Sequence, residues 1–218
     1  MPIQSNVVET IPTDKHVFVC GITGGGKSYL AERYLTGYEY VIKLDTKDET
    51  YERRSQNVSP WSGLTEGKDF TCCNKIDELD SIETKKIIYT PPYEEQNEQT
   101  FSDFFNWVFA RQNTIIWIDE LFSIGSSYKY PSGLGRVYTQ GRSKNVGIWA
   151  CTQRPSGVPS IAMANSSYWF VFDLPNIADR KKIVDMTGIP DMLQLPDGHN
   201  FWYYKLGNKR AIRAVLRE

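Results

Sequence analysis

The sequence predicts an α/β protein in which helices cover both sides of a mostly parallel sheet. Short apolar runs alternate along the chain with segments that space their apolar residues as amphipathic helices do. That order is typical of parallel strands joined by crossover helices. The runs are continuous rather than alternately polar, which indicates strands buried on both faces. Near the end, Gly207-Asn208 between two further runs predicts an antiparallel β-hairpin.

The first half of the chain supplies three predicted strands and two predicted helices. Four aromatic or aliphatic residues between positions 101 and 108 follow the i, i+3, i+4, i+7 spacing of an amphipathic helix: Phe101, Phe104, Phe105 and Val108. Residues 50–85 are rich in loop-forming residues, so no element is predicted there. We expect strands at residues 16–20, 40–44 and 86–90, and helices at residues 28–35 and 98–112.

The second half continues the alternation and ends in the hairpin. A helix is expected to end near Lys144, and Gly188 marks the end of another. The predicted strands are residues 114–118, 146–151 and 168–172. The helix that ends at Gly188 is predicted at residues 176–187, and the hairpin strands at residues 201–204 and 211–215.

Length and composition favour one folded domain. The chain has 218 residues, of which 40% are hydrophobic and 23% charged, which excludes disorder as its main state. We expect an N-terminal arm at residues 1–15 and a single domain at residues 16–218. The net charge of −1 excludes a strongly basic nucleic-acid binder, so any nucleic-acid contact must come from a local patch.

The spacing of the cysteines tests for a metal site, and the length of the apolar runs indicates where in the cell the protein is located. Cys20, Cys72, Cys73 and Cys151 lack metal-site spacing and are expected to be reduced thiols. No apolar run has the length of a signal peptide or a membrane span. We therefore expect a soluble protein of the cytoplasm.

Residues 21–28, Gly-Ile-Thr-Gly-Gly-Gly-Lys-Ser, fit the pattern G-x-x-x-x-G-K-[ST] between a predicted strand and a predicted helix. Glycines allow successive N–H groups to surround a phosphate at a helix N-terminus. Lys27 would contact the β- and γ-phosphates of ATP, and Ser28 would hold Mg²⁺. A glycine-rich turn that binds nothing is the alternative, which the strand and helix on either side disfavour. The predicted nucleotide-binding residues are Gly21, Thr23, Gly24, Gly25, Gly26, Lys27, Ser28 and Tyr29.

A second motif, which is acidic, complements the phosphate-binding loop (P-loop) predicted at residues 21–28. The predicted strand at residues 114–118 ends in Asp119-Glu120, at the edge where open α/β sheets bind ligands. We expect Asp119 to contact Mg²⁺ through water and Glu120 to polarise the attacking water, which a hydrolase requires. Asn74-Lys75-Ile76-Asp77 matches the guanine-reading motif of GTPases, but it precedes Asp119 and is interpreted as a chance match.

A third signal lies around the predicted strand at residues 146–151, which would carry Gln153 toward the γ-phosphate from between the two motif strands. A family resemblance rests on Asp45-Thr46-Lys47, Asp119-Glu120, Gly141-Arg142, Thr152-Gln153-Arg154-Pro155-Ser156 and the segment 23–30. Together these features resemble the FtsK-HerA superfamily of DNA-pumping ATPases, over roughly residues 15–172. The short chain with its terminal hairpin is most similar to the genome-packaging ATPases of tailless icosahedral viruses with an internal membrane.

The resemblance implies a RecA-like (ASCE) P-loop fold that uses ATP and Mg²⁺ to move double-stranded DNA without sequence specificity into a preformed capsid. It implies that Gln153 is a sensor and that Arg142 is an arginine finger offered to the neighbouring subunit of a hexameric or pentameric ring. Arg136 is a second candidate finger. Possible partners are capsid or membrane vertex proteins, and the expected location is the host cytoplasm and the packaging vertex.

Three other functions stay open at this point. One of them is a nucleotide-dependent assembly factor that never moves DNA. The other two are enzymes. One is a DNA-transfer ATPase of a plasmid or other mobile element, and the other is a small-molecule kinase, against which Glu120 and Arg142 argue. The loop around Tyr128, Lys129 and Tyr130 matches no known motif. The C-terminal basic cluster is either a solvated hairpin face or a contact with DNA or capsid: Lys205, Lys209, Arg210, Arg213 and Arg217.

Overall fold

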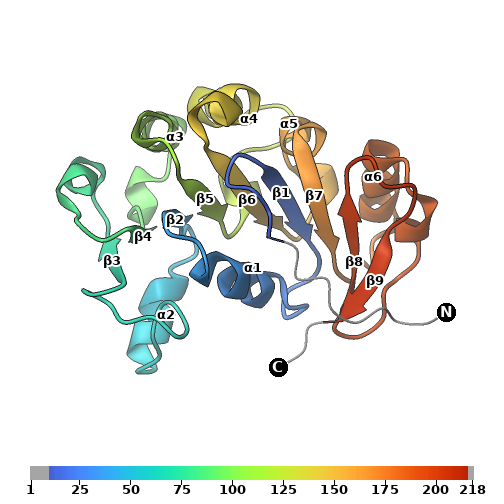
Figure 1. The fold of residues 1–218 in the computed structure, drawn as a ribbon, viewed down its shortest axis with the longest axis horizontal. Helices are drawn as coiled ribbons and strands as arrows, with labels where there is room; N and C mark the ends of the chain where they lie inside the picture. Colours follow the sequence, from blue (N-terminus) through green and yellow to red (C-terminus); the bar gives the residue numbers. More distant parts are fainter. Residues whose placement is uncertain (1–9, 216–218) are drawn as a thin grey trace.

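The computed structural model describes residues 10–215 and confirms the predicted α/β class (Figure 1). Its strands are β1 (His16–Cys20), β2 (Val41–Leu44), β3 (Phe70–Cys73), β4 (Lys86–Tyr89), β5 (Ile115–Ile118), β6 (Gly147–Thr152), β7 (Ser166–Val171), β8 (Asn200–Lys205) and β9 (Ile212–Val215). They form one sheet in the order β3-β4-β2-β5-β6-β1-β7-β8-β9. Strands β1 to β7 are parallel, and β8 and β9 add the predicted antiparallel hairpin.

Helices cover both faces of this sheet (Figure 1). Helices α1 and α2 lie on one side, and α3 to α6 lie on the other. Because crossover connections between parallel strands are right-handed, a reversal in strand order moves the helices to the opposite face. The helices are α1 (Lys27–Thr36), α2 (Glu49–Ser55), α3 (Glu98–Arg111), α4 (Ser132–Gln140), α5 (Ser160–Ala164) and α6 (Ile177–Thr187).

Two hydrophobic cores explain the continuous apolar runs. In β1, Val17 and Val19 pack into the core beneath α1, whereas Phe18 and Cys20 pack into the core beneath α3, α4 and α6. Successive strand residues point to opposite faces, so a strand between two covered faces needs apolar residues at every position. All five residues of β1 are buried. The P-loop therefore follows a strand that is enclosed on both faces of the sheet.

Residues 50–85 correct one prediction. We expected loops there, but the segment contains most of α2, strand β3 and a 3₁₀ turn at Ile76–Ser81. Helix α2 buries only Thr50, so it carries no apolar stripe that a sequence pattern can detect. Trp61, within the same segment, is fully buried. The guanine-like motif follows edge strand β3, with four strands between it and β1.

Other features of residues 10–215 concern the cysteines, the helices and the segment before β1. The four cysteines are free thiols. No helix within residues 10–215 is long and apolar enough to cross a membrane. Residues 10–15 of the predicted arm lie against the domain, where Ile11 is buried and its backbone exchanges hydrogen bonds with the Tyr38 hydroxyl. Residues 1–9 of the arm and Arg217 of the basic cluster lie outside the described residues.

Candidate nucleotide-binding site

The glycine-rich loop connects the carboxyl end of β1 to the first residue of α1. Gly26, which caps α1, has φ 103°, and Gly24 has φ 75°. Side chains with a Cβ rarely adopt these values. At Gly21, an added Cβ would lie 2.5 Å from the Cβ of Phe172. The loop conformation therefore requires these glycines, and it leaves the N-terminus of α1 at the edge of the sheet where anions bind.

Lys27 lies against this loop. Its side chain is buried, and Nζ donates a 2.8 Å hydrogen bond to the carbonyl oxygen of Ile22. Burial lowers the pKa of Lys27 from its usual value. The first turn of α1 carries no acidic residue, so the positive end of the helix dipole adds to the lysine charge. The ammonium is thus held at the loop that would surround a phosphate.

Ser28 and Asp119 join the two sequence motifs. Ser28 Oγ donates a 2.9 Å hydrogen bond to Asp119 Oδ1, at the end of β5. Asp119 is 3% exposed and Glu120 is 7% exposed. Burial would raise the pKa of Asp119, but the positive charges of Lys43 and Lys47 outweigh it and hold that pKa below its usual value. The carboxylate therefore stays ionised beside the hydroxyl.

These oxygen donors fit Mg²⁺. A hydroxyl and a carboxylate lie side by side at Ser28 and Asp119, and Mg²⁺ prefers oxygen ligands completed by water and substrate phosphates. Among residues 10–215, no group of three or more His, Cys, Asp or Glu side chains could hold a metal by itself. Ser28 and Asp119 are the residues that would hold Mg²⁺ with a nucleotide.

Lys47 is a site residue whose contacts were not predicted from the sequence. Its Nζ lies 3.3 Å from Asp119 Oδ2 and 3.4 Å from Glu120 Oε2. Burial would lower the pKa of Lys47, but the charges of these two acids outweigh it and raise that pKa. In the sequence, Asp45-Thr46-Lys47 contributes only to the family resemblance. The contact itself depends on strand β2 lying beside β5, which the pattern of one sequence does not reveal.

Gln153 lies beside the P-loop. Strand β6 runs between β5 and β1, and Gln153 follows its last residue. Thr23 Oγ1, in the P-loop, donates a 2.8 Å hydrogen bond to Gln153 Oε1. The amide is thus joined to the loop that would hold the terminal phosphates.

Arg142 lies at the opposite edge of the sheet. It precedes the start of β6, and its Nε is 3.5 Å from Oδ2 of Asp14, just before β1. The P-loop follows the other end of β1, so Arg142 does not reach its own P-loop. Its side chain is 80% exposed. Arg136, the second candidate finger, is instead engaged with α3, because its guanidinium lies 4.1 Å from the centre of the Phe109 ring.

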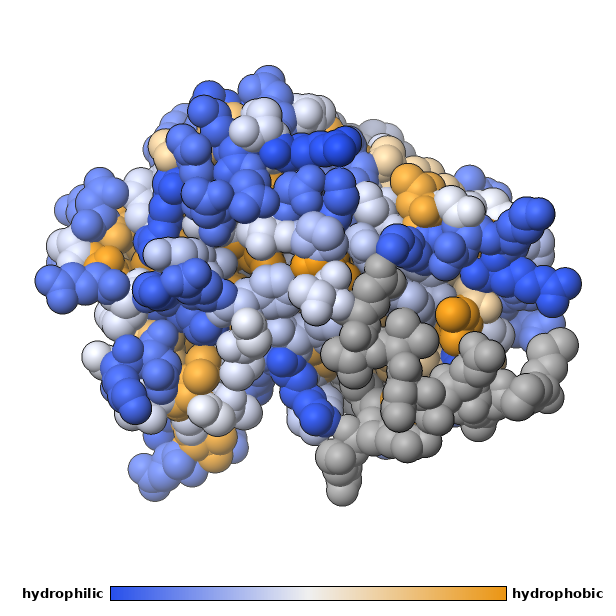
Figure 2. Space-filling view, in the orientation of Figure 1, coloured by the Kyte–Doolittle hydropathy of each residue, from blue (hydrophilic) through white to orange (hydrophobic). Residues whose placement is uncertain are grey.

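The other residues singled out in the sequence lie wholly or partly on the surface. Tyr29 is half exposed, and its hydroxyl accepts a hydrogen bond from Arg33. Tyr128 is 98% exposed, whereas Lys129 beside it forms an ion pair with Glu98. Hydrophilic residues dominate the face in Figure 2. In the C-terminal cluster, Arg213 is paired with Asp197.

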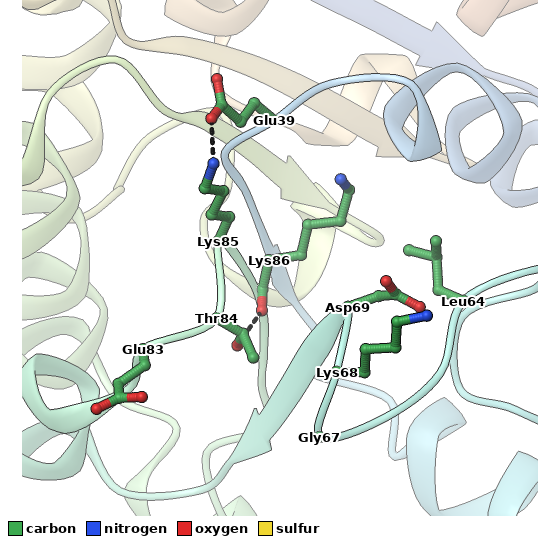
Figure 3. A pocket seen from close by; sticks show the side chains of 9 residues that line it. All are labelled: Glu39, Leu64, Gly67, Lys68, Asp69, Glu83, Thr84, Lys85 and Lys86. Carbon is green, nitrogen blue, oxygen red and sulfur yellow. Dashed lines mark hydrogen bonds and ion pairs between the residues drawn. The ribbon is translucent and has the colours of Figure 1, made fainter.

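A hollow of 490 Å³ lies away from these motifs (Figure 3). Its lining includes Glu39, which precedes β2, and Lys86, which begins β4. It is therefore at the amino ends of parallel strands, opposite the P-loop edge. Lys85 and Glu39 form an ion pair across it. None of the predicted site residues lines this hollow.

Solved structures of other proteins share this fold. Genome packaging NTPase B204 from Sulfolobus turreted icosahedral virus 2, in complex with sulfate, superposes with a TM-score of 0.73 at 14% identity, covering 95% of this chain and 100% of that chain. The chain shares the fold of this packaging NTPase. B204 has also been solved with ATP-gammaS, with a TM-score of 0.72 against this chain.

Two further solved proteins are also similar in fold. VirB4 of Thermoanaerobacter pseudethanolicus gives a TM-score of 0.62 at 11% identity, over 93% of this chain and 89% of that one. EssC from Geobacillus thermodenitrificans gives 0.60 at 13% identity, over 93% of this chain and 40% of that one. No protein-family model and no curated protein matches the chain. The predicted RecA-like P-loop fold is thus confirmed, and B204 is the kind of neighbour that the resemblance implied.

Proposed function

We propose that the protein hydrolyses ATP with Mg²⁺ as cofactor. The observation that carries this proposal is the hydrogen bond between Ser28 of the P-loop and Asp119, with Glu120 adjacent to it. Lys27 would bind the β- and γ-phosphates, and Glu120 would orient and polarise the attacking water. Gln153, bonded to Thr23 in the P-loop, would respond to the presence of the γ-phosphate. Bound Mg²⁺ would supply charge neutralisation at the phosphates.

The hydrolysis would drive movement of double-stranded DNA into a viral capsid. The fold shared with B204, a DNA-packaging ATPase by its published description, supports this substrate. DNA would be held by its phosphates rather than by its bases. The protein would act at the packaging vertex in the host cytoplasm, beside capsid or membrane vertex proteins.

A ring of subunits would complete each site. Arg142 is exposed and lies at the edge of the sheet remote from its own P-loop, a position suited to the P-loop of a neighbouring subunit. An arginine placed there would stabilise charge in the transition state. A ring of six subunits and a ring of five would both meet this requirement.

A DNA-transfer ATPase of a mobile element is the second candidate, and the shared fold with VirB4 favours it. A small-molecule kinase is disfavoured by the buried Glu120 at the metal side of the site, because phosphate transfer to a substrate hydroxyl must exclude an activated water.

The decisive experiment is ATP hydrolysis measured with and without long duplex DNA. We expect turnover that rises when duplex DNA is added, because DNA engagement and hydrolysis are coupled in a translocase. Equal turnover in both conditions would contradict the translocase. Absence of turnover, with a glycerol- or nucleoside-like acceptor restoring phosphate transfer, would establish a kinase instead.

A further inference from the structure

One ammonium group pairs with both acids of the candidate site. Lys47 Nζ lies 3.3 Å from Asp119 and 3.4 Å from Glu120, both of which are buried. The other oxygen of Asp119 accepts the hydrogen bond from Ser28. Two ionised carboxylates in a buried site are costly unless a cation compensates them. Lys47 supplies one such positive charge from within the chain and shares it between the two acids.

The backbone that carries Lys47 is anchored on both sides. The buried carboxylate of Asp45 accepts hydrogen bonds from the backbone N–H groups of Lys47, Glu49 and Thr50. Glu49 in turn lies 2.7 Å from Nζ of the fully buried Lys43. The turn is therefore fixed, whereas the Lys47 side chain is 36% exposed. Its ammonium can leave the acids by side-chain rotation alone.

We propose that Lys47 occupies the cation position between Asp119 and Glu120 in the nucleotide-free protein, and that a divalent cation displaces it only when that cation arrives with a nucleotide. This inference rests on the proposed ATP hydrolase. A free divalent ion competes with a resident ammonium, whereas an ion carrying phosphate ligands brings most of its coordination with it. Displacement also releases Glu120 from its ion pair, so the acid becomes available to water only in the loaded site.

The inference is tested by Mn²⁺ binding to the nucleotide-free full chain, with the electron paramagnetic resonance signal of free Mn²⁺ as readout. Lys47→Gln removes the charge and should lower the dissociation constant for Mn²⁺ at least tenfold. Lys75→Gln is the matched control, because Lys75 is an exposed lysine that is also paired with an acid, Glu78. The control should bind Mn²⁺ as the wild type does. Adding Asp119→Asn to Lys47→Gln should abolish the gain.

Lys47→Met, which keeps the aliphatic stem, gives a second measurement if Lys47→Gln unfolds. Equal Mn²⁺ affinity in the wild type and in the folded variant would overturn the inference. The wild type alone also tests the inference. If the nucleotide-free wild type bound Mn²⁺ as tightly as we expect of the variant, Lys47 would not block the site and the inference would be overturned. Because no nucleotide is present, a wild type that fails to hydrolyse ATP would contradict the proposed function while the lysine effect still stood.

Discussion

Ser28 Oγ and Asp119 Oδ1 lie 2.9 Å apart, although 91 positions separate the two residues in the chain. Ser28 is the second residue of α1, the helix that follows β1, and Asp119 follows β5, two positions along the sheet from β1. Parallel strands bring their carboxyl ends to one edge, so residues that follow different strands meet there. This contact joins the phosphate loop to the acidic pair, and the first prediction depends on it.

Lys27→Ala and Glu120→Gln should fail at different steps. Lys27→Ala removes the ammonium held at the P-loop and should abolish binding of a fluorescent ATP analogue. Glu120→Gln keeps the loop, so it should bind MgATP and lose hydrolysis by about a hundredfold or more, because water activation is lost. Equilibrium binding and phosphate release measure the two steps separately. Normal turnover by Glu120→Gln would remove Glu120 from the chemistry.

DNA binding should be independent of sequence and strongly dependent on salt. Contacts with phosphates release counterions, so the affinity for any duplex should fall steeply between low and physiological salt. Fluorescence anisotropy with several unrelated duplexes, each at a series of salt concentrations, measures both properties. A duplex bound orders of magnitude more tightly than the others would contradict phosphate tracking.

Arg142→Ala should bind nucleotide normally and lose hydrolysis even when subunits are assembled. Arg142 does not reach its own P-loop, and an arginine finger contributes on the order of a thousandfold in rate. For the wild type, turnover per subunit should rise with protein concentration, because assembly completes the site. Arg136→Ala is the matched control, since Arg136 is engaged with Phe109 of the same chain.

Mixing Arg142→Ala with Glu120→Gln should restore part of the activity. Some mixed interfaces then place an intact Glu120 of one subunit against an intact Arg142 of its neighbour. Full turnover by dilute wild-type monomer, matched by Arg142→Ala, would exclude a contribution from a second subunit.

His16 should make folding stability depend on pH. It is buried, its Nδ1 accepts a 3.0 Å hydrogen bond from the backbone of Ile148, and burial lowers its pKa to about 4. Below pH 6.5 the unfolded chain gains a proton that the folded protein does not take up until about pH 4. Stability is therefore present above pH 6.5 and is lost as the pH falls toward 4.

Comparison with His16→Asn isolates this effect, because asparagine retains an acceptor and does not titrate. Between pH 7 and pH 5 the wild type should lose about 2 kcal/mol more unfolding free energy than the variant. Urea unfolding at the two pH values measures the difference. Equal losses would mean that His16 takes up its proton in the folded state.

Local patterns predicted much of this molecule. The strand before the P-loop, the strand before Asp119 and the amphipathic helix α3 each carry their signal within a few neighbouring residues. Strand β3 escaped prediction because it is a four-residue edge strand with intermediate burial at its centre. The contact of Lys47 with Asp119 could not be predicted for another reason. The two residues are 72 positions apart in the chain, and their contact depends on which strands become neighbours in the sheet.

The opposite placement of Arg142 and the P-loop limits the symmetry of any assembly. If Arg142 serves a neighbour, the contact joins two different edges of the subunit, so it is heterologous and no two-fold axis can relate its halves. A symmetric dimer would leave Arg142 without a site. Each added subunit instead presents a free edge to which another subunit can bind. Addition of subunits stops only when the rotation between neighbours brings the last subunit back to the first and closes a ring. An angle that does not close would give a helical filament.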